Sequence, residues 1–184
     1  MKLIIGLGNP EEKFTHTRHN VGFRVLDDFA KEQGASFKLE KKFKAEVAEL
    51  SSDGEKVILA KPMTYYNLSG EAARAICDFY KIEPHDVLVI HDELALPFGT
   101  IRSRLGGSDA GNNGVKSINT HLGPDTARIR VGIWNDLRDR IDDANFVLSR
   151  FTAEESAALD EKTQKITSLI DAFIQGQFEP TTHS

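Results

Sequence analysis

The sequence predicts an α/β fold: a single-domain, three-layer sandwich in which helices flank a mixed, twisted β-sheet. Two observations support this prediction. Short apolar runs such as Leu3–Leu7 and Val87–Ile90 are typical of buried strands, and they alternate with segments whose apolar residues recur at helical spacing. The 184 residues contain no internal repeat or linker, which fits one domain over residues 1–184.

The first half of the chain is predicted to form a strand, a helix, a hairpin and a second helix. Leu3–Leu7 is the strand, and Asn9-Pro10 ends it because proline restricts its neighbour and lacks a donor. The other elements are a helix carrying Val21, Val25, Leu26 and Phe29 up to Gly34, edge hairpin strands at Ala45–Leu50 and Glu55–Ala60, and a helix with Ser69 as its N-cap.

The second half continues the alternation. A central strand, Val87–Ile90, ends at His91-Asp92, and a glycine-rich loop separates the next two strands. Those strands are Thr100–Leu105 and Ala127–Trp134, the loop is Gly106–Gly114, and the last helix carries Ile166, Leu169, Ile170 and Phe173. The polar tail from about Gln177 is expected to be frayed.

Composition narrows the class of protein. The chain is 40% hydrophobic and 28% charged, which is ordinary for a globular protein. No apolar run approaches the roughly 18 residues of a spanning helix, and Met1–Gly6 is too short for a signal peptide. The single cysteine, Cys77, lies in an apolar helical pattern and excludes an internal disulfide. We expect a cytoplasmic, monomeric protein with no membrane partner.

The net charge of −5 argues against a nucleic-acid partner, but the average hides a basic segment. Between residues 102 and 130 the only acids are Asp109 and Asp125. Because salt screens charge over about 8–10 Å, a local basic face can still bind phosphate. The basic residues of this segment are Arg102, Arg104, Lys116, Arg128 and Arg130.

Polar residues interrupt apolar elements at four places, where chemistry is expected. In α/β sheets, ligands bind beyond the carboxyl ends of strands, and Asn9 and Asp92 occupy such positions. They face one cleft if their strands are neighbours. The four places are Gly8-Asn9-Pro10, Thr17-Arg18-His19-Asn20, Tyr66-Asn67-Leu68-Ser69-Gly70, and His91-Asp92 with the glycine loop.

A histidine and an aspartate from separate segments can activate water. The carboxylate accepts the imidazole Nδ1–H and fixes the tautomer, so the other nitrogen can take a proton. Nearby asparagines can donate amide N–H bonds to a developing oxyanion. No serine lies in a Gly-x-Ser-x-Gly turn and Cys77 has apolar neighbours, which favours water over a covalent nucleophile.

Plainer interpretations stay open for each motif. Most histidines are surface or core residues, and Asn9-Pro10 and Asn113-Gly114 are ordinary turn dipeptides. The glycine loop matches no phosphate-binding pattern and serves equally as a connection. No Cys/His spacing supports zinc, and His85 and His91 lack a third ligand, so we expect neither metal nor cofactor.

Taken together, six stretches resemble the bacterial-type peptidyl-tRNA hydrolase family. They occur in the family's order, and the likeness runs from residue 3 to about 150. One motif alone would be weak, whereas six in register favour pairing His19 with Asp92. The stretches are Ile5-Gly6-Leu7-Gly8-Asn9-Pro10, Thr17-Arg18-His19-Asn20-Val21-Gly22, Lys61-Pro62-Met63-Thr64, Asn67-Leu68-Ser69-Gly70, His91-Asp92-Glu93-Leu94 and Gly111-Asn112-Asn113-Gly114.

The resemblance implies an esterase that frees peptides from tRNA without a metal. His19 matches the base that activates water, Asp92 the residue that holds it in its basic form, and Asn9 the residue that distinguishes a blocked ester from a free aminoacyl ester. The remaining matches are substrate contacts. Asn67, Asn112, Asn113, Phe14, Tyr65 and Tyr66 stand at or beside positions near the peptide or the tRNA 3′ end, and Arg102, Arg104 and Arg130 match positions that hold tRNA phosphates.

The chain also departs from the family pattern. The usual loop, Gly-His-x-Gly-His-Asn-Gly, has lost both histidines, and Asn112 stands where the second is common. Tyr66 replaces a usual methionine, Phe14 a usual tyrosine, and Trp134-Asn135-Asp136 a usual Gly and Pro. These departures bear on turnover and substrate preference rather than on reaction type.

Two alternatives to the hydrolase remain. The altered loop and Tyr66 suggest an RNA-binding protein of the same fold that has lost efficient catalysis, which predicts salt-sensitive tRNA binding without cleavage. An unrelated small-molecule hydrolase of α/β class needs a nucleophile that the sequence does not contain.

Overall fold

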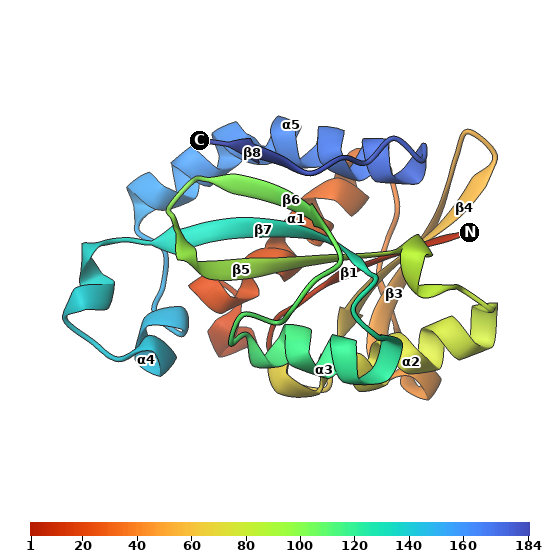
Figure 1. Ribbon diagram of the computed structural model, residues 1–184, viewed down its shortest axis with the longest axis horizontal. Helices are drawn as coiled ribbons and strands as arrows, with labels where there is room; N and C mark the ends of the chain where they lie inside the picture. Colours follow the sequence, from red (N-terminus) through yellow and green to blue (C-terminus); the bar gives the residue numbers. More distant parts are fainter.

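The computed structural model describes residues 1–184 and has one eight-stranded mixed sheet between two layers of helices (Figure 1). The predicted α/β sandwich is therefore confirmed. The strand order is β2-β3-β4-β1-β5-β7-β6-β8. The strands are β1 (Lys2–Gly6), β2 (Lys38–Glu40), β3 (Ala45–Ser52), β4 (Glu55–Pro62), β5 (Val87–Pro97), β6 (Ile101–Leu105), β7 (Ala127–Trp134) and β8 (Thr181–His183).

Helices cover both faces of the sheet. In Figure 1, α5 lies above the sheet and α2 and α3 below it, with the short α4 at one end. Helix α1 passes behind the strands and packs in the same core as α5. Their bounds are α1 (Val21–Glu32), α2 (Ser69–Tyr80), α3 (Asn113–Leu122), α4 (Asp143–Val147) and α5 (Ala153–Ile174). None of these helices is both long and apolar enough to span a membrane.

From Leu3 to Gly6 the central strand β1 is apolar, because both of its faces are buried there. Successive side chains of a strand point to opposite faces. Ile4 therefore belongs to the core beneath α1 and α5, and Leu3 and Ile5 belong to the core beneath α2 and α3. This two-sided burial explains why the first strand shows no alternation of apolar and polar residues.

The topology brings Asn9 and Asp92 to the same end of the sheet. Strands β1 and β5 are parallel neighbours, and Gly6 pairs with Ile90. The prediction that the central strand ends at His91-Asp92 is wrong. Strand β5 runs on to Pro97, because its residues from His91 to Glu93 pair with β7 beyond the end of β1. Asp92 is thus held inside a strand.

Three local predictions also need correction. The glycine loop leads into helix α3, which the sequence reasoning did not predict. Ser69 is the first residue of α2 and not its N-cap, since its hydroxyl donates to the Tyr66 carbonyl. The tail is not frayed: β8 pairs with β6, and the Ser103 hydroxyl bonds the Glu179 carbonyl at 2.6 Å.

Candidate active site

A cavity of about 670 Å³ opens at the shared end of β1 and β5. Its lining includes residues from all four polar stretches of the sequence, although these are far apart along the chain. We call it the catalytic cavity. The predicted site residues in its wall are Asn9, His19, Tyr65, Tyr66, Asn67, Asp92, Asn112 and Asn113.

His19 and Asp92 are in direct contact in the wall of this cavity. His19 Nδ1 lies 2.9 Å from Asp92 Oδ2, and the Asp92 side chain is only 2% exposed. Burial opposes the carboxylate charge, but the charge of His19 and hydrogen bonds from His19 and Tyr66 outweigh it and lower the pKa of Asp92. An ionised Asp92 makes Nδ1 the donor, which leaves Nε2 free to accept a proton.

The segment that carries His19 is anchored through its neighbour Arg18. The Arg18 guanidinium is 1% exposed and donates to both carboxylate oxygens of Glu155, at 2.8 and 3.0 Å. Its Nε donates to the Ser149 hydroxyl at 2.9 Å. This bidentate pair ties the segment that carries His19 to the start of α5. The Thr152–Glu155 spacing indicates a capping box, but nothing local indicates that Glu155 also binds Arg18.

Tyr66 lies beneath the His19 ring. The two ring centroids are 3.5 Å apart and the planes differ by 14°. The Tyr66 hydroxyl donates to Asp92 Oδ1 at 2.5 Å and accepts from Asn112 Nδ2 at 2.8 Å. Its side chain is 2% exposed, so its hydroxyl contacts the aspartate rather than the open part of the cavity. We expected Tyr66 to contact substrate, and the geometry gives it a different set of partners.

Hydrogen bonds fix the side-chain oxygen and the backbone of Asn9, and none of them involves its side-chain nitrogen. Its Oδ1 accepts the Tyr66 backbone N–H at 2.8 Å. Asn20, which is 2% exposed, bonds both the backbone N–H and the backbone carbonyl of Asn9 at 2.9 Å. These bonds commit the Asn9 oxygen, so its N–H₂ group is available to a ligand. The sequence motif contains Asn20 but does not indicate this role.

The rim of the cavity is formed by more exposed side chains. Asn67 and Asn113 are exposed, and Tyr65 has a backbone φ of 67°, a left-handed value that is costly for tyrosine. The Tyr65 hydroxyl bonds Glu11 at 2.8 Å. Phe14 ends a short 3₁₀ helix, Glu12–Phe14, outside the lining. An apolar stretch completes the wall, from Leu94, Ala95, Ala144, Val147 and Leu148.

Four arginines lie on one face of β6 and β7, outside the catalytic cavity. Arg102 is paired opposite Arg130, and Arg104 opposite Arg128, so their side chains share a face. We call this set the arginine face. Arg128 is 2% exposed, and burial lowers its pKa, with further contributions from the charges of Arg104 and Arg130. Such repulsion favours an anionic partner at this face.

The members of the arginine face differ in their partners. Arg128 donates to the carbonyls of Gly107 and Ser108, which holds the glycine loop. Arg130 forms a largely buried ion pair with Glu93. Arg104 has no ion-pair partner, and Arg102 bonds only the Thr182 hydroxyl, at 3.0 Å. Arg102 and Arg104 are therefore the members best placed to meet a phosphate.

Comparison with known proteins identifies the family. Residues 3–184 match the family described as "Peptidyl-tRNA hydrolase". The chain is 45% identical to the peptidyl-tRNA hydrolase of Geobacillus kaustophilus over 179 residues, covering 97% of this chain and 95% of the relative. It is 43% identical to that of Ligilactobacillus salivarius over 176 residues, covering 95% and 94%.

The chain belongs to the peptidyl-tRNA hydrolase family. The structure agrees with that assignment. The crystal structure of the Acinetobacter baumannii peptidyl-tRNA hydrolase superposes with a TM-score of 0.88 at 34% identity, over 96% of this chain and 90% of that one. A purine nucleoside phosphorylase from Toxoplasma gondii matches with a TM-score of 0.56 at 8% identity, which reflects the fold alone. The family predicted from six motifs is confirmed.

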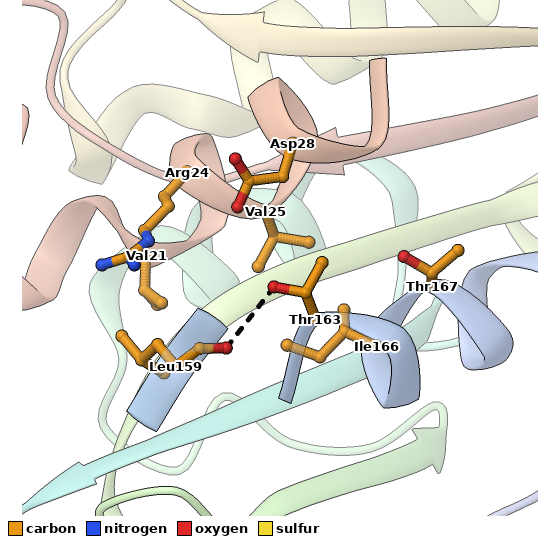
Figure 2. Close-up of a pocket in the computed structure, with 8 residues that line it drawn as sticks. All are labelled: Val21, Arg24, Val25, Asp28, Leu159, Thr163, Ile166 and Thr167. Carbon is orange, nitrogen blue, oxygen red and sulfur yellow. Dashed lines mark hydrogen bonds between the residues drawn. The ribbon is translucent and has the colours of Figure 1, made fainter. Parts of the chain in front are cut away.

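In this member of the peptidyl-tRNA hydrolase family, a further pocket does not compete with the catalytic cavity. Figure 2 shows it between α1 and α5, with Arg24 and Asp28 from one helix facing Leu159 and Thr163 from the other. Its volume is about 20 Å³, which is room for about one water molecule. No three His, Cys, Asp or Glu side chains converge to hold a metal ion.

Proposed function

We propose that the chain hydrolyses the ester that joins the peptide to tRNA in peptidyl-tRNA, with His19 as the general base. The single observation that carries this proposal is the 2.9 Å contact between His19 and the buried Asp92 in the wall of a cavity large enough for a substrate. Membership in the family supports the choice of substrate.

The reaction follows from the groups around the cavity. His19 Nε2 accepts a proton from a water molecule as the water oxygen bonds to the ester carbonyl carbon. The carbonyl oxygen becomes negative and accepts a hydrogen bond from the Asn9 amide. When the intermediate collapses, the bond to the ribose oxygen breaks, and that oxygen takes the proton from His19. The products are a peptide carboxylic acid, which ionises, and tRNA with a free ribose hydroxyl.

Asp92 assists without touching the ester. Its ionised carboxylate holds the Nδ1–H of His19 and stabilises the imidazolium that forms during attack. Because burial favours a neutral group, the bonds that keep Asp92 charged are part of what makes His19 a base. The neutral Asn9 suits a blocked amine, since an amide has no carboxylate to attract a free ammonium.

The arginine face supports the tRNA half of the proposal. Arg102 and Arg104 offer guanidinium groups to phosphates, and Arg130 beside them shares its charge with Glu93. Phosphate contacts carry no base information, which suits an enzyme that acts on many tRNAs.

Deacylation of an N-acetyl-aminoacyl-tRNA tests the proposal. We expect turnover by the native chain, no measurable turnover by His19→Ala, and little change in His85→Ala, whose side chain is exposed. Unblocked aminoacyl-tRNA, assayed in parallel, should be a poor substrate. Normal turnover in His19→Ala would contradict the mechanism. If the native chain binds tRNA in a salt-sensitive way but does not cleave the ester, the RNA-binding alternative is favoured.

A further inference from the structure

We propose that Tyr66 and Asn112 act together as positioning residues that fix the Asp92 carboxylate against His19. The inference rests on the proposed function, because it assigns these two residues to the same His19–Asp92 pair. It goes beyond that function because it assigns both residues to the orientation of Asp92 beside His19 rather than to contact with the substrate. They are also two of the positions at which the chain departs from the family pattern.

The contacts form one continuous chain of hydrogen bonds. Asn112 Nδ2 donates to the Tyr66 hydroxyl at 2.8 Å, and this hydroxyl donates to Asp92 Oδ1 at 2.5 Å. Asp92 Oδ2 then meets His19 Nδ1 at 2.9 Å. Each carboxylate oxygen has its own donor, so rotation of the Asp92 carboxyl breaks a bond on either side. The Tyr66 ring also stacks on the His19 ring, so Tyr66 contacts His19 directly as well as through Asp92.

The direction of each bond is determined by the groups at its ends. Asn112 Oδ1 caps helix α3 by accepting the Val115 N–H at 3.0 Å, so its Nδ2 is the atom that faces Tyr66. Burial, followed by the Asp92 charge, raises the pKa of Tyr66 well above its ordinary value. Tyr66 therefore keeps its proton and donates it to Asp92. The start of α3 is thereby connected to the base.

The backbone around Tyr66 is built to accept its ring. A side chain at Gly114 would collide with the Tyr66 ring and would reach Leu7 at 3.0 Å. The Tyr66 N–H is held by Asn9 Oδ1 at 2.8 Å. Asn113-Gly114, which is an ordinary turn dipeptide in the sequence, here gives the tyrosine room between α3 and β1. Tyr66 is therefore held at its backbone N–H and at its hydroxyl, and it can keep the Asp92 carboxyl in one orientation.

The arrangement has a consequence for the pH at which the base works. A phenol that donates to Asp92 stabilises the charged carboxylate and so helps to lower the pKa of Asp92. The other titratable groups facing Asp92 are few: the neighbouring His91, whose pKa is lowered by burial, and Glu93, which is paired with Arg130. Removing the phenol should raise the pKa of Asp92 and move the acidic limb of the rate profile to higher pH.

Tyr66→Phe tests this inference, because it removes the hydroxyl and keeps the stacked ring. We expect kcat at the optimum to fall about tenfold, which is the scale of one hydrogen bond to a charged group, with KM unchanged. The acidic limb of the pH–kcat profile should move to higher pH. Tyr80→Phe is the matched control: its hydroxyl also bonds a carboxylate, Glu49, at 3.0 Å, but away from the cavity. An unchanged profile in Tyr66→Phe would overturn the inference.

Asn112→Ser tests the coupling of the two residues. Serine can still cap α3 but cannot donate an amide N–H to Tyr66. Alone it should lower kcat severalfold, and in the Tyr66→Phe background it should have no further effect. Multiplicative losses in the double variant would refute the coupling.

A readout without turnover separates this inference from the proposed function. The ¹³C signal of the Asp92 carboxyl, followed against pH in the free protein, should titrate at higher pH in Tyr66→Phe than in the native chain or in Tyr80→Phe. If His19→Ala keeps its activity, the proposed mechanism fails, but this titration still tests whether the Tyr66 hydroxyl stabilises the Asp92 carboxylate. An unshifted titration contradicts the role of Tyr66 whatever the activity. Thermal unfolding of each variant confirms that it is folded.

Discussion

The catalytic cavity and the arginine face both present polar groups, but they are constructed in opposite ways. In the cavity, the groups to which we assign the reaction already have partners within the protein: Asp92 has two donors, and Asn9 is fixed by Asn20 and Tyr66. On the arginine face, like charges lie opposite one another, and Arg104 has no ion-pair partner. One region holds its groups in fixed geometry, and the other includes two arginines, Arg102 and Arg104, whose charge no ion pair compensates.

The contrast follows from what each region must bind. A transition state is stabilised by dipoles that are already oriented, because reorienting them during the reaction costs free energy. A polyanion is attracted by net charge and tolerates loose geometry, since its counterions are released on binding. Changes in the cavity should therefore lower kcat, and changes on the arginine face should raise KM and alter salt dependence.

The largest effect is expected for Asp92→Asn. An amide in place of the carboxylate lets His19 adopt the other tautomer and leaves the imidazolium without a counter-charge, so kcat should fall about 10³–10⁴-fold. Single-turnover deacylation of N-acetyl-aminoacyl-tRNA measures it. Asp78→Asn, on the exposed side of α2, serves as the control. A loss of less than tenfold would show that orientation of His19 is unimportant.

Asn9→Asp should have the next largest effect, about 10²-fold on kcat, because the carboxylate can still accept the Tyr66 N–H but has no amide N–H for the oxyanion. The new charge should also attract the free ammonium of an unblocked substrate, so discrimination between blocked and unblocked aminoacyl-tRNA should decrease. The ratio of the two kcat/KM values measures this. An unaltered ratio would mean that selection for blocked substrates lies elsewhere.

The double change Arg102→Ala with Arg104→Ala should raise KM about tenfold or more and leave kcat unchanged. The slope of log affinity against log salt should become shallower by about 2, one for each lost phosphate contact. Lys41→Ala with Lys42→Ala removes equal charge at the opposite edge of the sheet and is the control. A fall in kcat, rather than a rise in KM, would contradict the assignment of binding to the arginine face and of catalysis to the cavity.

The smallest effect on activity is expected for Arg130→Ala, which removes a member of the arginine face whose partner Glu93 lines the catalytic cavity. We expect KM to rise about threefold, less than for the exposed arginines, since the Glu93 ion pair already uses part of its charge. Stability should also fall, because Glu93 is left buried without its partner. Adding Glu93→Gln should restore the melting temperature but not KM. Recovery of both would assign Arg130 a purely structural role.

Sequence alone predicted strands β1 and β3–β7 and helices α1, α2 and α5 in the right order, because apolar periodicity is a local property that burial imposes on each element. It also revealed the polar residues that interrupt apolar segments, and these selected His19, Asp92 and Asn9. The limits were equally local. Helix α3 was missed because glycine and asparagine disguise its start, and β8 was missed because a polar edge strand has no apolar signature.

Tertiary structure decided which polar groups are partners. Asp92 meets His19 from 73 residues away, and Tyr66 meets Asn112 from 46 away. Arg18 and Glu155 are 137 residues apart. A hydrogen bond depends on a few tenths of an ångström and on the direction of the donor, and such geometry exists only once the sheet has brought these segments together. The sequence predicted His19 as the base, and only the packed structure links Tyr66 and Asn112 to the Asp92 carboxylate beside it.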